Sequence, residues 1–206
     1  MTIPPTFPAS PARRIVALLL VAMVAAPCGA IAPAAEGDAR LDALMSALAQ
    51  RRHGHATFIE HQYLAIIKRP LVSSGELYYD APGRLEKRTL APKPGSLLLD
   101  AGTVTVTLGK RTHALSLHDY PQLASLLESI RATLAGDRTA LEQQFTLSPQ
   151  FAGDDWTLGL VPRDAAVATI VARIRIAGVG DSVQEVEVRR ADGDRSVMTI
   201  QELPDK

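Results

Sequence analysis

The most informative stretch of the sequence is residues 96–117, SLLLDAGTVTVTLGKRTHALSL. At its centre, TVTVTL (103–108) alternates threonine with valine or leucine, which is the period of a strand with one apolar face. Ala101-Gly102 and Gly109-Lys110 form short turns that separate this segment from apolar runs on either side. Three short strands joined by tight turns are typical of an antiparallel meander.

The same pattern continues on both sides of this meander. Segments with period-two alternation recur, separated by turn sequences such as Ala81-Pro82-Gly83 and Asp192-Gly193-Asp194. We therefore expect about eleven strands in total. They cover residues 57–68, 74–80, 84–90, 96–100, 103–108, 111–117, 144–147, 156–161, 168–177, 182–189 and 196–202.

Three segments follow the helical period instead. Residues 38–52 are expected to begin at an Asp38 cap and to bury the stripe Leu41, Leu44, Met45 and Leu48. Residues 123–135 form the second helix, which Gly136 ends. Asp137 can cap a third, short helix over residues 138–143. The apolar face of the second helix is Leu123, Leu126, Leu127, Ile130 and Leu134.

These elements indicate a mainly β, α+β fold. A closed barrel is one arrangement, but an open sheet needs a cover, and both longer helices carry a single apolar stripe that suits this role. We therefore expect an unclosed, strongly curved antiparallel half-barrel covered by lid helices. Aromatic residues make up only 4% of the chain, so its concave side should be aliphatic and without polar anchors. Such a surface suits an acyl chain, although the pattern also allows an ordinary solid core.

The N-terminal segment reads as a secretory signal peptide. Arg13-Arg14 precede the apolar run Ile15 to Ala26, which is too short to cross a bilayer as a helix. We expect cleavage after Ala34, which leaves a single domain over residues 35–206. Cys28 could mark a lipoprotein, but Pro27 before it is unfavourable for lipidation. With cleavage after Ala34, Cys28 is removed and the mature chain has no cysteine.

Composition and motifs argue against several function classes. The 22 basic and 22 acidic residues balance without long charge runs, so nucleic acid is not an expected partner. Hydrolase elbows and phosphate-binding loops are missing from the sequence, and we expect no enzymatic activity and no cofactor. The acidic pairs at 154–155 and 192–194 lie at expected turns. The five histidines, of which His53, His55 and His61 are close in sequence, are expected to be exposed, with a metal site as the alternative.

Three segments together resemble the LolA-type outer-membrane lipoprotein carrier family. They are Phe58-Ile59-Glu60-His61-Gln62, then Gly75 to Leu85 (GELYYDAPGRL), then Leu97 to Gly102 (LLLDAG). The family has an F-x-Q segment, a G-D-L-W-x-x-R-P segment and an apolar strand ending in Asp-Gly. The resemblance implies an unclosed barrel with a helical lid, in a periplasmic shuttle that takes acylated cargo from an inner-membrane transporter to an outer-membrane acceptor.

The sequence departs from the family pattern at the lid. The family motif has an arginine before the proline, and this arginine ties the lid to the sheet. Here the position is Ala81, and Arg69 in Lys68-Arg69-Pro70 does not replace it, because that pair precedes the glycine motif. The chain therefore resembles a divergent member, whose cargo is a lipoprotein or a glycolipid.

The expected function is a monomeric periplasmic lipid carrier. The alternative is a lipid-sensing or protein-binding envelope module with the same half-barrel, but such a sensor is expected to need a further domain, for which residues 35–206 leave no room. The cavity is expected to be lined by Leu77, Tyr79, Val104, Val106, Leu115, Leu117, Trp156, Leu158 and Leu160, with Leu123, Leu126, Leu127, Ile130 and Leu134 from the lid.

Overall fold

The alternating segments pair into one antiparallel sheet in the computed structural model, which describes residues 33–204. The sheet has 11 strands in the order β6-β5-β4-β3-β2-β1-β11-β10-β9-β8-β7. The edge strands β6 and β7 do not pair with each other, so the sheet is open, and the predicted half-barrel is confirmed. The strands are β1 (His53–Tyr63), β2 (Leu71–Asp80), β3 (Arg84–Ala91), β4 (Gly95–Asp100), β5 (Thr103–Leu108), β6 (Arg111–Ser116), β7 (Phe145–Ala152), β8 (Asp155–Pro162), β9 (Val171–Val179), β10 (Ser182–Arg190) and β11 (Arg195–Glu202).

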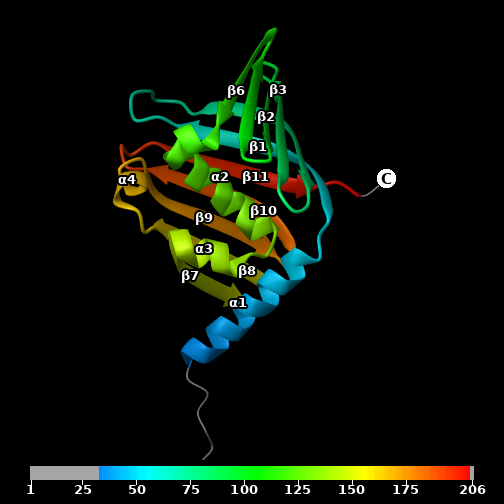
Figure 1. Ribbon diagram of the computed structural model, residues 1–206, viewed down its shortest axis with the longest axis vertical. Coiled ribbons are helices and arrows are strands. Elements are labelled where there is room, and N and C mark those ends of the chain that lie inside the picture. Colours follow the sequence, from blue (N-terminus) through cyan, green and yellow to red (C-terminus); the bar gives the residue numbers. More distant parts are fainter. Residues whose placement is uncertain (1–32, 205–206) are drawn as a thin grey trace, which may run out of the picture. The chain divides into compact units, whose positions relative to one another are not determined.

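The helices lie on one face of this sheet. The chain leaves edge strand β6 through a short turn, η1 (Leu117–Asp119), and reaches the opposite edge strand β7 through α2 (Pro121–Leu134) and α3 (Arg138–Gln144). Because this connection joins the two edges, it has to cross the sheet, and Figure 1 shows α2 and α3 doing so. Helix α1 (Pro33–Ala49) precedes the sheet, and α4 (Ala165–Ala168) lies between β8 and β9.

The corner between α2 and α3 agrees with the predicted signals. Gly136 adopts φ +65°, and the following Asp137 N–H donates to the Ala132 carbonyl at 2.8 Å, which closes the end of α2. The Asp137 carboxylate accepts from the Ala140 N–H at 2.9 Å and caps α3. A Cβ at position 136 would lie 2.0 Å from the Met45 carbonyl oxygen, so α1 packs directly against this corner.

A solid core fills one half of the concave side. The predicted α1 stripe, Leu41, Leu44, Met45 and Leu48, is buried there against large side chains of α3 and β7–β10. This core also contains Ala132 of α2, so α2 packs against the same core at this residue. Its largest members from the sheet and α3 are Leu141, Phe145, Trp156, Leu158, Leu160, Ile174 and Ile176.

Several predicted boundaries are wrong. Helix α1 begins at Pro33 and ends at Ala49, so Asp38 is not its cap; the Asp38 carboxylate instead accepts from Arg138 Nη2 of α3 at 3.0 Å. Strand β1 begins at His53, because its pairing with β2 extends to the start of the segment. The residues from 168 were expected to open a strand, but α4 ends there and β9 begins at Val171, since Asp164 caps the short helix.

The segment expected to be a signal peptide lies, up to residue 32 and including Cys28, outside the described residues. No helix within residues 33–204 combines the length and hydropathy needed to cross a bilayer.

A close approach between β2 and β3 requires a glycine. The pairing shifts register between Ser74 and Gly75, so that Ser74 faces Ala91 while Gly75 faces Thr89. A Cβ at Gly75 would lie 1.9 Å from the Arg88 carbonyl oxygen. Such bulges increase the local twist of a sheet and contribute to its bending.

We predict that Gly75→Ala destabilises the protein by at least about 2 kcal/mol, because the new methyl group meets backbone that cannot move without breaking the ladder. Urea unfolding followed by circular dichroism measures this. The matched control is Gly37→Ala in α1, where a Cβ meets nothing within 4 Å and the change should be neutral or stabilising by up to about 1 kcal/mol. Equal effects of the two substitutions would contradict the assignment of Gly75.

Candidate functional site

The other half of the concave side is hollow. A cavity of about 460 Å³ lies between α2 and the sheet, within the range of about 300–1,000 Å³ that is typical of small-molecule sites. Helix α2 contributes Leu126, Leu127, Ile130 and Leu134 to its wall. The sheet contributes Ala56 of β1, Leu77 and Tyr79 of β2, Leu85 of β3 and Leu97 of β4. The wall is completed by Ile176, Val183, Val186, Val188, Met198 and Ile200 of β9–β11.

Helix α2 buries small residues where α1 buries large ones. Ser125, Ser129, Ala132 and Thr133 form the buried part of α2. The Ser129 hydroxyl donates to the Leu126 carbonyl and the Thr133 hydroxyl to the Ser129 carbonyl, both at 2.7 Å, so these polar groups are satisfied within the helix. Helix α2 therefore approaches the core closely and turns its leucines towards the space above β1–β4.

The predicted lining residues divide into three groups. Leu77, Tyr79, Leu126, Leu127, Ile130 and Leu134 lie together around the cavity. Trp156, Leu158 and Leu160 are instead packed in the solid core, and the Trp156 indole donates to the Gly180 carbonyl at 2.9 Å. Of the remainder, Val104 is fully buried and Val106, Leu115, Leu117 and Leu123 are partly buried, and these five do not line this cavity.

Sequence reasoning missed the wall formed by β10 and β11. These strands were expected, and the alternation of Val186, Val188, Met198 and Ile200 is visible in the sequence. Their place in the sheet could not be predicted, because β11 pairs with β1, which is far away in the sequence. This pairing places β10 and β11 under α2.

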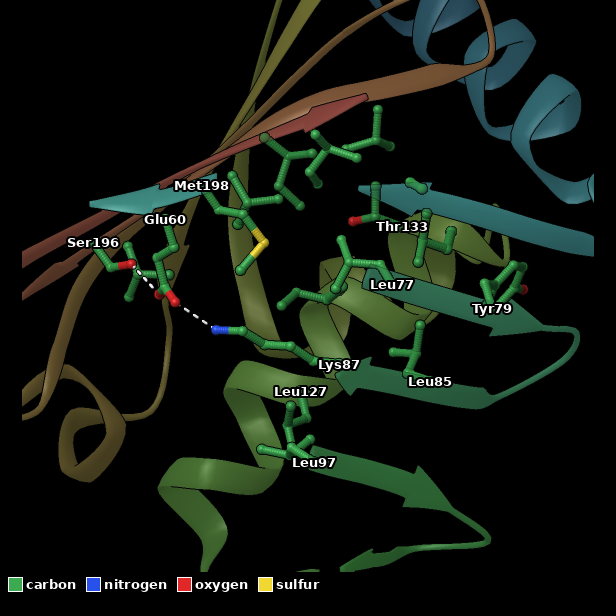
Figure 2. A pocket seen from close by; sticks show the side chains of 18 of the residues that line it. Glu60, Leu77, Tyr79, Leu85, Lys87, Leu97, Leu127, Thr133, Ser196 and Met198 are labelled. Carbon is green, nitrogen blue, oxygen red and sulfur yellow. Dashed lines mark hydrogen bonds and ion pairs between the residues drawn. The ribbon is translucent and has the colours of Figure 1, made fainter. Parts of the chain in front are cut away.

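The expectation of a wall without polar anchors is wrong. Glu60 of β1 is only 6% exposed, and its Oε2 lies 2.5 Å from the Lys87 ammonium of β3. Ser196 of β11 donates to Glu60 Oε1 at 2.5 Å, and Ser73 donates to Oε2 at 3.3 Å. The Lys87 ammonium also lies 4.8 Å from the centre of the Phe58 ring. Glu60, Lys87 and Ser196 all line the cavity, and Figure 2 shows them on one side of it.

This environment keeps the Glu60 carboxylate charged. Burial alone would raise the pKa of Glu60, but the Lys87 ammonium and hydrogen bonds from Lys87, Ser196 and Gln62 outweigh it, so the pKa lies below its usual value. Glu60 is therefore a carboxylate at neutral pH, and the Lys87 ammonium balances its charge.

Further polar groups in the cavity wall differ in how they are satisfied. The Arg51 guanidinium forms a two-point ion pair with Glu202, with Nη2 to Oε2 at 2.8 Å, and Nη1 also donates to the Asp181 carbonyl at 2.9 Å. The Tyr79 hydroxyl is buried and has no hydrogen-bond partner within the part of the chain that the structure describes. Burial raises the pKa of Tyr79, so this hydroxyl stays protonated.

Helix α2 is tied to the sheet by an arginine of its own. With Ala81 at the family's arginine position, the family's lid contact was not expected. In the structure, Arg131 of α2 donates from Nη1 to the Pro82 carbonyl of the β2–β3 turn at 3.2 Å. The same guanidinium pairs with Glu128 one turn earlier, which holds it in place. The arginine that ties α2 to the β2–β3 turn therefore lies on the helix and not on the turn.

The histidines do not converge. His53 Nδ1 lies 3.0 Å from Asp80 Oδ1, and the His55 ring stacks on Tyr78 with centroids 4.5 Å apart. Among residues 33–204, no group of three or more histidine, cysteine, aspartate or glutamate side chains is arranged to hold a metal ion.

Comparisons with known proteins complete this picture. The family model described as "Outer membrane lipoprotein carrier protein LolA-like" matches residues 31–201. Among curated proteins, no sequence matches the chain.

Three similar solved structures are remote in sequence. A LolA superfamily protein from Nitrosomonas europaea is 10% identical, with 82% of this chain and 94% of that chain covered and a TM-score of 0.46. A putative outer membrane lipoprotein-sorting protein domain from Vibrio parahaemolyticus is 10% identical, with 81% and 92% covered and a TM-score of 0.43. A chain of the MucA/MucB complex of Pseudomonas aeruginosa is 12% identical, with 81% of this chain and 59% of that chain covered and a TM-score of 0.45.

The ion pair of Glu60 and Lys87 should make the free energy of unfolding depend on pH in the acidic range. A carboxylate with a lowered folded-state pKa stabilises the fold above its unfolded pKa of about 4.3, and this contribution is lost as the pH falls through the folded value. We predict that Glu60→Gln lowers the free energy of unfolding at pH 7, and that its difference from the wild type shrinks as the pH falls below about 4. Urea titrations at several pH values measure this. A difference that stays constant with pH would contradict the ion pair.

The Arg131 contact should restrain α2. We predict that Arg131→Met increases amide hydrogen exchange in α2, because the bond to the Pro82 carbonyl is lost, while exchange in β8 and β9 stays unchanged. Hydrogen exchange with mass spectrometry measures both regions in one experiment. The control is Arg138→Met, which removes ion pairs between α3 and α1 and should act on those helices instead. The prediction fails if both variants change α2 equally.

Proposed function

Since the chain belongs to the LolA-like family of outer membrane lipoprotein carrier proteins, we propose that it carries the acyl chains of lipoproteins or other lipid-linked cargo across the periplasm. The observation that carries this proposal is the apolar cavity between α2 and the sheet, with its volume of about 460 Å³. All lining residues of the cavity except Glu202 lie inside the matched residues, and the cavity uses the elements that define the fold.

The energetics of acyl chains explain why such a cavity is needed. Each methylene group moved from water into an apolar environment contributes about 0.8 kcal/mol, so a chain of about sixteen carbons costs on the order of 10 kcal/mol to expose. Unaided transfer between membranes is therefore too slow. Leucine, isoleucine, valine and methionine side chains in the wall replace the membrane interior during transit.

Loading and release require α2 to move. Helix α2 covers the cavity and is held by the Arg131–Pro82 hydrogen bond on one side and by the core around Ala132 on the other. The packing around Ala132 stays in place in this proposal, whereas the Arg131–Pro82 hydrogen bond contributes only about 1 kcal/mol and breaks easily. We propose that α2 exchanges between closed and open positions, and that acyl chains stabilise the open one.

In this proposal the protein is not an enzyme. Residues 1–34 direct it to the periplasm, an inner-membrane transporter loads it and an outer-membrane acceptor unloads it. The lining residues expected to touch the chain are Leu77, Tyr79, Leu126, Leu127, Ile130 and Leu134, joined by the residues of β10 and β11.

We predict that Leu127→Asp lowers binding of acyl lipids at least tenfold, because it places a charge in the apolar wall. Leu127→Trp should do the same without a charge, because it fills the space. The measurement is the amount of lipid that co-purifies from the periplasm, quantified by mass spectrometry. Leu108→Asp is the matched control, because Leu108 is 64% exposed and does not line the cavity. Unchanged lipid in both folded Leu127 variants would exclude the cavity as the site.

A transfer assay separates a carrier from a sensor. With a fluorescent acyl lipid in donor vesicles, a carrier should increase the rate of transfer to acceptor vesicles in proportion to its concentration. A sensor that uses the same cavity would bind the lipid without this increase. Binding without transfer would therefore retain the lipid site and overturn the shuttle.

A further inference from the structure

The cavity wall is apolar in its middle and polar at both ends along three neighbouring strands. On β1 the inward-facing series runs from Ala56 to Glu60 and Gln62, and on β11 the paired series runs from Glu202 through Ile200 and Met198 to Ser196. On β10 it runs from Val186 and Val188 to Arg190. The register places these changes side by side, since Glu60 faces Met198, Gln62 faces Ser196, and Val188 faces Ser196 from the other side. The two polar ends of this lining differ in how their hydrogen-bonding groups are satisfied.

Lys87 is placed where the wall changes from apolar to polar. It lies on β3 opposite Leu77 of β2, and Leu77 in turn lies opposite Ala56 of β1. Its ammonium nevertheless reaches Glu60, so the side chain crosses β2 along the cavity wall, as Figure 2 shows. The methylene groups of Lys87 belong to the apolar part of the wall, and its ammonium belongs to the polar part.

The ammonium has unused hydrogen-bonding capacity. An ammonium group has three N–H donors, and among the described residues the only acceptor for Lys87 is Glu60. Glu60 is already surrounded by donors from Lys87, Ser196 and Ser73. At the opposite end of the cavity, the Arg51 guanidinium has both terminal nitrogens engaged by Glu202. Lys87 can thus donate to a ligand while its own charge is balanced, whereas the Tyr79 hydroxyl, unpaired among the described residues, is enclosed by protein atoms.

The charge balance indicates what kind of acceptor fits. Glu60 lies 2.5 Å from the ammonium, so an anionic ligand group on Lys87 would also lie close to the buried carboxylate and be repelled by it. A neutral carbonyl or hydroxyl oxygen meets no such repulsion. A buried ester or amide carbonyl also needs a donor, because an unpaired polar group is costly in an apolar site.

We infer that the cavity binds its ligand in one orientation, with an ester or amide carbonyl on the Lys87 ammonium beside Glu60 and the hydrocarbon tail towards Ala56, Leu77 and Ile200. This inference rests on the proposed function and specifies the ligand class as neutral acyl esters or amides rather than free fatty acids. Stability alone does not explain an ion pair in this wall, because hydrophobic residues in place of a buried ion pair often give a protein that is equally stable.

The experiment compares matched ligands on the wild type. Methyl laurate, laurate and dodecane compete with the apolar dye N-phenylnaphthylamine, whose fluorescence reports occupancy of the cavity. We expect methyl laurate to bind about tenfold more tightly than dodecane and also more tightly than laurate. Tighter binding of laurate than of methyl laurate would overturn the neutral class. If neither dodecane nor the others displace the dye, the proposed function itself fails.

A paired variant tests the residues. Glu60→Gln with Lys87→Met removes both charges together, so that no unpaired buried charge remains, and the glutamine oxygen still accepts from Ser196. Methyl laurate affinity should fall about tenfold to that of dodecane, while dodecane affinity stays unchanged. The control, Lys110→Met on the exposed β5–β6 turn, should change neither. Equal loss of both ligands, or retention of methyl laurate by the paired variant, would overturn the role of Lys87.

Discussion

The structure depends on how unequally the concave side of the sheet is filled. Helix α1 inserts Leu41, Leu44, Met45 and Leu48 over β7–β10, and the space there is closed by contacts with Trp156 and its neighbours. Helix α2 buries serine, alanine and threonine instead, and its leucine and isoleucine side chains line a cavity against β1–β4 and β9–β11. One sheet thus supports both a conventional core and a cavity.

This division also separates stability from function. A well-packed core stabilises through dispersion and the exclusion of water, whereas atoms that face a void lack partners on one side. The α1 half therefore has the denser packing, and in the proposed function the α2 half is the part that opens. The corner at Gly136 joins the two halves, since it lies against the Met45 carbonyl and directly follows α2.

The local elements could be predicted from the sequence, and the site only in part. Alternation over 96–117 and the stripes at 41–48 and 123–134 identify strands and helices, because these periods depend on neighbouring residues. Which apolar strands face a void depends on strand order, and the pairing of β1 with β11 joins residues far apart in the chain. This is why Leu158 and Leu160 resembled cavity residues although α1 covers them, and why Met198 and Ile200 were overlooked.

The charged residues show more clearly what the sequence alone could not predict. In the sequence, Glu60 and Lys87 are ordinary polar positions on two separate strands, and a wall without anchors follows from the scarcity of aromatic residues and the abundance of aliphatic ones. Their meeting across β2 depends on the register of both pairings and on the length of the lysine side chain. A purely aliphatic wall would bind any hydrocarbon in either direction. A single balanced donor at one end makes the two directions of an amphiphile unequal in energy, so the interaction that distinguishes this cavity from a simple apolar void is electrostatic and depends on tertiary structure.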